Sequence, residues 1–260
     1  MKSNNIDIGY FFELLLAFTE KEIKARYKNA VLGFLWILLN PLLQMLIIGF
    51  IFQNFIDIPV SNYFLFIFTG LLPWNFFSYS FTKTTPSIVY ERALIQKAKF
   101  PHEIIPLSII LSNFFHLLIS LALLITYLLL VGNINLGIWQ FIKLFSSLLW
   151  LLIFTSGLSL FTSALDVKYR DVNFFVQALA TLWFYATPVI YSLQILPKTY
   201  FSLFCFNPIA YPFEMLRSSL INTPLPPTNI LITNLSLSLI ITVLGSFIFY
   251  KESKTFSDWL

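Results

Sequence analysis

Residues 104–131 read IIPLSIILSNFFHLLISLALLITYLLLV, a run of 28 residues without a formal charge. A helix rises 1.5 Å per residue, so about 20 apolar residues cross the hydrocarbon core of a bilayer. This run is long enough to span a membrane. Five further apolar stretches occur at about 31–54, 63–82, 140–165, 173–191 and 230–250. We predict an all-α integral membrane protein with six transmembrane helices.

Composition excludes an ordinary soluble domain. Hydrophobic residues make up 58% of the 260 residues and charged residues only 11%. Soluble proteins are about 45–50% apolar and about 25% charged. Aromatic residues make up 18% of the chain. This composition suits a protein that works in or across a bilayer.

The placement of Lys and Arg predicts the orientation of the chain. Of the 16 basic residues, 13 fall on the side that holds both termini when six spans are counted. Cytoplasmic segments carry an excess of Lys and Arg. We therefore expect both termini in the cytoplasm, and the net charge of +4 calls for no nucleic-acid partner.

Motifs for covalent chemistry are missing from the sequence. It contains no G-x-x-x-x-G-K-[ST] loop for a nucleotide, and no H-E-x-x-H, G-x-S-x-G or CxxC. Cys205 is the single cysteine, and the two histidines, His102 and His116, have no Cys/His cluster around them. We expect no catalytic residue, no metal site and no cofactor on this chain, with any energy supplied by another subunit.

Three cytoplasmic segments carry patterned charge. Residues 10–28 predict an amphipathic helix, with Phe12, Leu16, Thr19, Ile23 and Tyr27 on one face and charges such as Glu20 and Lys24 on the other. Residues 87–98 predict a short helix with Ser87 as its N-cap. The turn Asp166–Asp171 carries charge of both signs. Each segment is either a solvated surface or a contact for a soluble partner.

Polar residues interrupt two of the apolar regions. Asn113, His116 and Ser120 form a stripe along 104–131, which either bonds a neighbouring helix or faces a substrate. Residues 188–229 hold seven prolines but remain rich in Phe, Leu and Tyr. Because broken backbone at membrane depth needs protein or a cavity around it, we predict two re-entrant helices at about 198–205 and 209–221. Glu214 and Arg217 could pair on the second.

A series of short motifs resembles the ABC-2 type permeases that export polysaccharides and polyol phosphates, such as O-antigen, capsule and teichoic acid. The N-terminal motif runs from Glu22 to Trp36 (EIKARYKNAVLGFLW) and is followed by Asn40-Pro41-Leu42. The later motifs are 70–74 (GLLPW), 94–101 (LIQKAKFP), 106–107 (PL), 166–172 (DVKYRDV), 188–191 (PVIY) and 207–208 (NP). They follow the family's order over essentially the whole chain.

The resemblance implies one transmembrane domain over residues 1–260, in the inner membrane of a bacterium. It implies a homodimer that pairs with two copies of a separate ATPase, which binds ATP and Mg²⁺. Residues 10–28 would be the interface helix, 87–98 the coupling helix and 192–228 the outer re-entrant segment. The cargo would be a lipid-linked polysaccharide moved from the cytoplasm to the outside.

Three groups of residues follow as candidates. Coupling to the ATPase is expected at Glu20, Lys24, Lys28, Ser87, Tyr90, Glu91, Arg92, Asp166 and Arg170. Aromatic residues can stack on the C–H faces of sugars, and the candidates for the channel wall are Trp36, Trp74, Tyr79, Trp183 and Tyr185. Each of these could instead face lipid or pack between helices. The expected outer gate comprises Pro197, Asn207, Pro208, Glu214 and Arg217.

The sequence is compatible with three other functions. The same permease architecture could carry teichoic acid, capsule, a drug or a small lipid. A membrane transferase that uses a lipid-linked donor would need clustered acids or histidines, for which Asp166 and Asp171 are the nearest candidates. A passive scramblase or scaffold is the third alternative.

Overall fold

The computed structural model describes residues 8–28, 32–55, 62–132, 137–193, 204 and 206–260. These ranges form helices, turns and connecting segments, with no strand among them. The helices are α1 (Ile8–Tyr27), α2 (Trp36–Phe55), α3 (Tyr63–Thr84), α4 (Ser87–Tyr90), α5 (Arg92–Lys97), α6 (Ile104–Val131), α7 (Ile138–Lys168), α8 (Asp171–Ala186), α10 (Ala210–Ile221), α11 (Thr228–Glu252) and α12 (Phe256–Trp259). Single 3-10 turns at Gly33–Leu35 and Ser253–Thr255 precede α2 and α12.

Five helices within the described ranges, α2, α3, α6, α7 and α11, are long and apolar enough to cross a membrane. The predicted span at 173–191 corresponds to α8, which ends at Ala186 after 16 residues. At 1.5 Å per residue it reaches roughly 24 Å, short of a full hydrocarbon core. The six-span count therefore stays a prediction.

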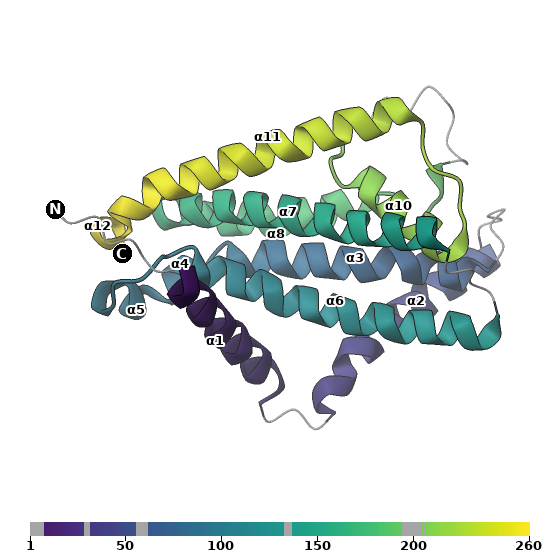
Figure 1. Cartoon of the computed structure of the whole chain (residues 1–260), viewed down its shortest axis with the longest axis horizontal. Coiled ribbons are helices and arrows are strands. Elements are labelled where there is room, and N and C mark those ends of the chain that lie inside the picture. Colours follow the sequence, from purple (N-terminus) through teal and green to yellow (C-terminus); the bar gives the residue numbers. More distant parts are fainter. Residues whose placement is uncertain (1–7, 29–31, 56–61, 133–136, 194–203, 205) are drawn as a thin grey trace.

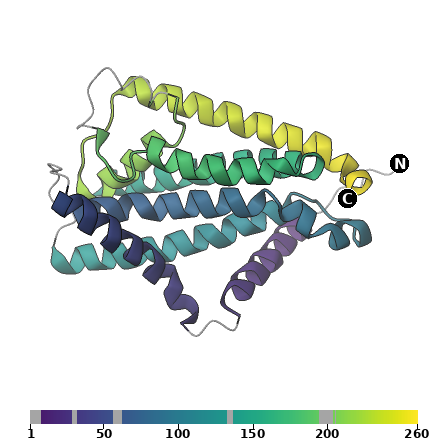
Figure 2. The same ribbon diagram turned by 180° about the vertical axis from the view of Figure 1, so that it is seen from behind.

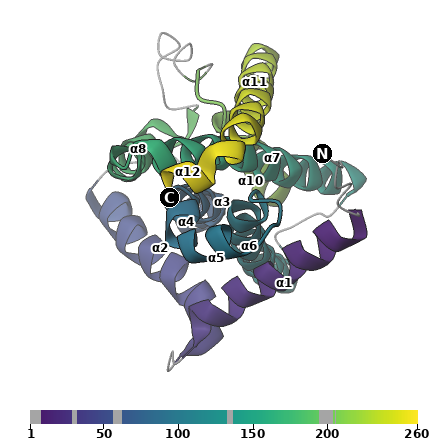
Figure 3. The same cartoon turned by 90° about the vertical axis from the view of Figure 1, so that its left-hand side faces the viewer.

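Helix α3 lies at the centre of the bundle, ringed by α2, α6, α7, α8 and α10 (Figure 3). It has the lowest mean hydropathy of the five candidate spans, 1.3, and the highest buried share, 72%. These two properties belong together, because a helix shielded from lipid can hold polar side chains at membrane depth. The polar residues of α3 are available for a functional site for the same reason.

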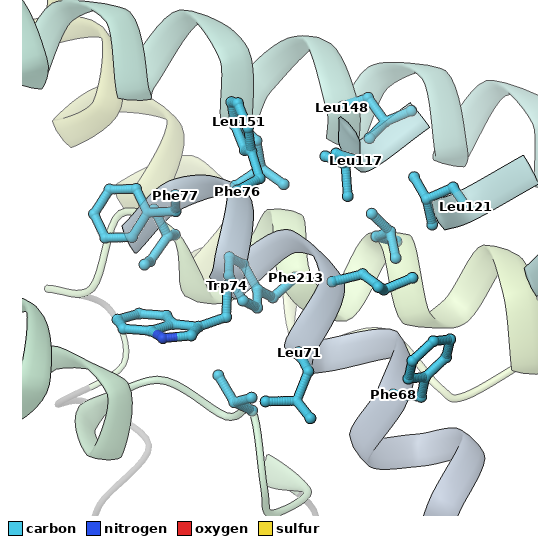
Figure 4. Packing of buried hydrophobic residues seen from close by; sticks show 14 of the residues in the cluster. Phe68, Leu71, Trp74, Phe76, Phe77, Leu117, Leu121, Leu148, Leu151 and Phe213 are labelled. Carbon is cyan, nitrogen blue, oxygen red and sulfur yellow. The ribbon is translucent and has the colours of Figure 1, made fainter. Parts of the chain in front are cut away.

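Aromatic and aliphatic side chains fill the core around α3 (Figure 4). Trp74 and Phe77 of α3 lie close to each other, and the Trp74 ring also approaches Phe213 of α10 and Phe184 of α8. Lipid tails are as apolar as these side chains, so close packing rather than escape from water stabilises such a core. The core joins α3 to the helices on both sides of it.

Helices α7 and α11 cross at two glycines. A Cβ atom on Gly157 would lie 2.3 Å from the Thr242 Cα atom, and one on Gly245 would lie 2.2 Å from the Gly157 carbonyl oxygen. Small residues let helix backbones approach closely in a membrane. This contact fixes α11 on the face of α7 that points away from α3 (Figure 1).

Helix α1 packs against α6, while α1 and α2 both slope outward from the bundle (Figure 2). The predicted helix at 10–28 is confirmed, but its predicted apolar face is partly wrong. Phe12 and Leu16 are 56% and 64% exposed, whereas Leu15 is buried. The face toward α6 is set by contacts that the periodicity of α1 alone does not reveal, including those of Arg26 and Tyr27.

The predicted single helix at 87–98 is instead two short helices, α4 and α5, which meet at Glu91. The backbone of Glu91 has φ −92° and ψ 21°, which interrupts the helical path. The prediction that Ser87 is an N-cap is wrong, because Pro86 takes that position and the Ser87 hydroxyl donates to the Thr84 carbonyl. This bond ties α4 to the last turn of α3.

The re-entrant helix predicted at 209–221 coincides with α10, with Ile209 preceding its first residue. The helix is confirmed, and its re-entrant path stays a prediction. It packs between α7 and α3, near the end of the bundle opposite to α4, α5 and α12 (Figure 1). The companion helix predicted at 198–205 lies, except for Phe204, outside the described residues. Pro197 also lies outside them.

Candidate functional site

A groove with a volume of about 850 Å³ runs along α3. Helix α3 forms its floor, α2 and α8 form its sides, and α1 and α4 border the end where α4 and α5 gather. Most of its polar lining residues come from three long helices: Gln44 of α2; Asn75, Ser78, Tyr79, Thr82 and Lys83 of α3; Asn173, Gln177, Thr181 and Tyr185 of α8. The others are Glu22 of α1, Ser87 and Tyr90 of α4, Glu91, and Ser108 of α6. Amide and hydroxyl groups dominate this list, which suits neutral polar ligands such as sugars.

A hydrogen-bond network joins α2 to α3 at the edge of the groove. Asn40 Nδ2 donates to the Tyr79 hydroxyl at 2.8 Å, and Asn75 Nδ2 donates to Gln44 Oε1 at 3.2 Å. Polar side chains between transmembrane helices find partners across the interface in this way. The network holds α2 against α3 without any charged group, so the groove wall stays neutral here.

The structure separates the five aromatic channel candidates. Trp74, Tyr79 and Tyr185 line the groove. Trp36 lines a second, smaller cavity, which Tyr79 also borders. Trp183 is turned into the core instead, where its ring packs on Phe77, Phe81 and Phe154. Three of the five can therefore contact a ligand in the groove.

Asn207 connects the residues before α10 to the end of α8. Its side-chain oxygen accepts from Trp183 Nε1 at 3.0 Å, and its nitrogen donates to the Ala186 carbonyl at 3.0 Å and to Thr187 Oγ1 at 3.1 Å. The next residue, Pro208, accepts at its carbonyl from Ser238 of α11. The pair Asn207-Pro208 thus ties the end of α8 to the start of α10 and to α11.

Arg217 is fully buried and makes polar contacts to three groups. Its Nη1 bonds Glu214 at 2.5 Å, as the spacing predicted, and its Nη2 donates to the carbonyls of Pro188 and Val189 at 2.9 and 3.0 Å. Its guanidinium stacks over the Phe66 ring at 3.8 Å. Arg217 therefore fastens the chain that follows α8 onto α3.

Gly70 of α3 leaves the room that this arginine needs. A Cβ atom there would lie 2.6 Å from Arg217 Nη2 and 2.8 Å from the Val189 carbonyl oxygen. Such distances are far below van der Waals contact, so any side chain would displace the guanidinium or the backbone. The glycine in the 70–74 motif is thus explained by packing against Arg217.

The candidates for coupling to the ATPase occupy three kinds of position. Tyr90, Arg92, Arg170 and Lys28 are exposed. Glu20 and Lys24 form an exposed ion pair on α1, in which Lys24 lowers the pKa of Glu20 through a hydrogen bond and its charge. Asp166 is buried instead and accepts from the Asn173 backbone N–H at 3.1 Å, which satisfies a free donor of the first turn of α8. Ser87 is likewise buried.

Glu91 does not point freely toward solvent. It binds Lys21 of α1 at 2.7 Å, which links α1 to the junction of α4 and α5. Phe18 of α1 also contacts Phe100, which follows α5. The predicted interface and coupling segments are therefore in direct contact within one chain.

A separate hydrophobic cluster lies beneath α4 and α5. Ile88 and Ile95 from these helices are buried with Leu160 and Val167 of α7, Phe249 of α11, and Phe256 and Leu260 of the C-terminal segment. The His102 ring stacks beside Phe256, and burial lowers the pKa of His102 from its usual value of 6.5. Direct packing in this cluster connects α4 and α5 to α7 and α11.

Exchanging the charges of Lys21 and Glu91 tests this link. An exposed ion pair contributes only about 0–1 kcal/mol to stability, so Lys21→Glu and Glu91→Lys should each leave the protein folded. We expect each single change to reduce export several-fold through like-charge repulsion between α1 and the α4–α5 junction. The double exchange should restore export, and Glu13→Lys, a charge reversal at another exposed position of α1, serves as the control. Equal export by all variants would show that this pair transmits nothing.

Sequence reasoning missed several residues that build the site. Asn40, Gln44 and Asn75 form the α2–α3 network, while Arg26 and Lys83 line the smaller cavity. The sequence did signal these residues, because it places side-chain amides within apolar runs. An amide at membrane depth is unfavourable unless it has a hydrogen-bond partner or lines a polar cavity. That signal indicates that a polar surface exists but not which helix faces it.

Comparison with known proteins agrees with this architecture. Residues 13–221 match the family described as "ABC-2 type transporter". The chain is 33% identical to an O-antigen export system permease protein RfbA of Klebsiella pneumoniae, covering 98% of this chain and 97% of the relative. It is 30% identical to a protein of the same name from Myxococcus xanthus, covering 94% of each. It is 23% identical to the polysialic acid transport protein KpsM of Escherichia coli, over 76% of this chain.

Proposed function

The chain belongs to the ABC-2 type transporter family, and from this membership we propose that it is the transmembrane subunit of an ATP-driven ABC exporter. Its cargo is a lipid-linked, O-antigen-like polysaccharide, carried from the cytoplasm to the outer side of the bacterial inner membrane. The relatives named as O-antigen export permeases match over nearly its whole length, which supports this cargo over a drug or a small lipid.

The groove along α3 is the observation that carries the proposal. Its lining combines amides, hydroxyls and aromatic rings from α2, α3 and α8. Unpaired polar groups are costly against lipid tails, so such a surface needs water or protein in front of it. A second copy of the chain, placed groove to groove, encloses a conduit, with α8 as a short sixth span.

The ATPase acts from the cytoplasmic end, which holds both termini. Its closure pushes on α4 and α5, and the hydrophobic cluster passes the motion to α7 and α11. The bond from Ser87 to Thr84 passes it to α3, whose side chains form the floor of the groove. ATP and Mg²⁺ bind to two ATPase copies, and this chain performs no covalent chemistry.

The outer end closes the conduit until cargo passes. Helix α10 enters the bundle from the outside as a re-entrant helix, and Arg217 fastens it to the Pro188 and Val189 carbonyls and to Phe66 of α3. The buried Glu214–Arg217 pair suits this role, because it holds an otherwise broken segment at membrane depth.

Co-purification tests the proposed assembly. The tagged chain, extracted in mild detergent, should bring down a separate protein with a Walker motif in equal amount, and the complex should hydrolyse ATP. A preparation that is stable alone, without any ATPase, would contradict the proposal and favour a transferase or a scramblase.

A bulky side chain in the groove tests where the cargo passes. Gln177→Trp should lower polysaccharide export by about tenfold or more while ATP hydrolysis continues, because Gln177 lines the groove on α8. Phe174→Trp is the matched control, since Phe174 lies on the same helix, is 70% exposed and does not line the groove. Normal export by the Gln177 variant would place the conduit elsewhere. Surface polysaccharide and ATPase activity are the two readouts.

A further inference from the structure

A second cavity of about 320 Å³ lies where α1, α2, α3 and α6 meet. Trp36, Ile37 and Pro41 of α2 and Leu117 of α6 form an apolar part of its lining. The opposite part is polar and includes Arg26 of α1, Lys83 of α3, and Asn113, His116 and Ser120 of α6. The polar stripe on α6 thus faces α1 and this cavity rather than the large groove.

Arg26 is held in this cavity by neutral groups. Its guanidinium contacts His116 Nδ1 at 2.5 Å and the side-chain oxygen of Asn113. Because an arginine can only donate, Nδ1 must accept, which puts the histidine proton on Nε2, 3.0 Å from the Tyr27 hydroxyl. His116 is then neutral, and Asn113 is fixed in turn by a bond to Ser80. These contacts orient the guanidinium without neutralising its charge.

The charges around this cavity do not balance. None of its lining residues is a carboxylate, and among the described residues neither Arg26 nor Lys83 forms an ion pair. Glu22, one turn before Arg26, lines the large groove and attracts Lys83 from that side. One positive charge is left over within a membrane domain, where charged side chains are costly unless paired. An anion in the cavity would supply the missing partner.

We propose that this cavity binds the phosphate or diphosphate headgroup of a lipid. Arg26 and Lys83 face the anion, Tyr27 and Asn40 add hydrogen-bonding groups, and the apolar wall at Trp36 and Ile37 receives the first carbons of the chain. Guanidinium and ammonium groups form strong charge-assisted bonds with phosphate. The site deepens the proposed function, because a lipid-linked polysaccharide carries such a headgroup between its glycan and its membrane anchor.

Ligand-dependent thermal stability of the purified complex with its ATPase tests the site. The probes are farnesyl diphosphate, phosphatidylglycerol, inorganic diphosphate and neutral farnesol, each titrated in the same detergent. A ligand that binds only the folded protein raises the apparent Tm as its concentration passes Kd. Lys83→Gln is the main variant, since Lys83 is exposed at the cavity and its loss should not prevent folding. Arg26→Gln is the second variant, and Lys251→Gln, at an exposed position of α11 that lines neither cavity, is the control.

We expect farnesyl diphosphate to stabilise the unaltered complex and the Lys251 variant, with Kd raised about tenfold or more by either cavity variant. Equal binding of phosphatidylglycerol, with the same loss in the variants, would support the site and identify bulk phospholipid as its occupant. Equal binding of inorganic diphosphate would likewise assign the site to a free phosphate. Unchanged affinity in the Lys83 variant, or equal stabilisation by farnesol, would overturn the proposal. A complex that hydrolyses ATP and exports polysaccharide, but shows no anion-dependent stabilisation, would reject this site and leave the proposed function intact.

Discussion

Replacing Arg217 with alanine is expected to remove most of the folded protein from the membrane. The substitution leaves Glu214, which is 3% exposed, without a partner. It also leaves the carbonyls of Pro188 and Val189 without the donor that they share. Removing one partner of a buried ion pair costs about 3–5 kcal/mol, a large fraction of typical domain stability. The amount of monodisperse protein that survives detergent extraction and heating measures the effect.

Two comparisons separate this explanation from a general sensitivity of α10. Lys143→Met removes a half-buried cation that makes one hydrogen bond to the neighbouring Ser218, and it should cost about 1 kcal/mol. Gly70→Ala should reproduce much of the Arg217 defect, because its Cβ atom would push against Nη2. Wild-type stability of the Arg217 variant would mean that the segment after α8 is held by other contacts.

Replacing Gly157 with leucine is expected to detach α11 from α7. Even the Cβ atom of the new residue would overlap the Thr242 backbone, at 2.3 Å from Cα, so rotation of a side chain cannot relieve the contact. Overpacking of this kind typically costs 1–3 kcal/mol or more. Because Phe249 of α11 belongs to the cluster beneath α4 and α5, export should fall together with stability.

The matched control for Gly157 is Leu149→Phe, which enlarges a residue of the same helix that is 45% exposed. It should leave thermal stability and export near wild-type values. Gly157→Ala should fall between the two, since it adds only the first atom of the clash. Equal stability of all three variants would show that α7 and α11 do not depend on this close approach.

Much of the fold could be predicted from hydropathy alone. The span at 104–131 matches α6 to the residue, because both its ends are marked, by Pro101 before it and Gly132 after it. Gly132 adopts φ 73°, a left-handed conformation that ends the helix. Helix α8 was harder to predict, since its apolar run continues beyond Ala186 while its helix does not. An apolar run indicates that its residues lie in an apolar environment, but it does not show where the helix ends.

The candidate site was predictable only in part. Spacing was enough for the Glu214–Arg217 pair, because i and i+3 positions are neighbours on any helix. Long-range partners were not predictable: Glu91 meets Lys21, Asp166 meets the Asn173 backbone, and Asn207 meets Trp183. Helix periodicity fixes which residues share a face, but tertiary packing decides which faces meet. For this reason the sequence did not reveal that Asp166, on a turn predicted to be solvated or to contact a partner, is buried, or that Glu91 pairs with Lys21.

Transport by the purified assembly tests whether the chain and its ATPase export a lipid-linked polysaccharide. The chain and its ATPase would be reconstituted in liposomes that contain a lipid-linked polysaccharide on the side of the ATPase, and appearance of the glycan on the opposite face would be followed with a membrane-impermeant lectin or glycosidase. We predict transfer that requires ATP and is lost in the Gln177→Trp variant but kept in Phe174→Trp. Transfer that proceeds equally without ATP, or no transfer despite vigorous ATP hydrolysis by a folded complex, would contradict the assignment.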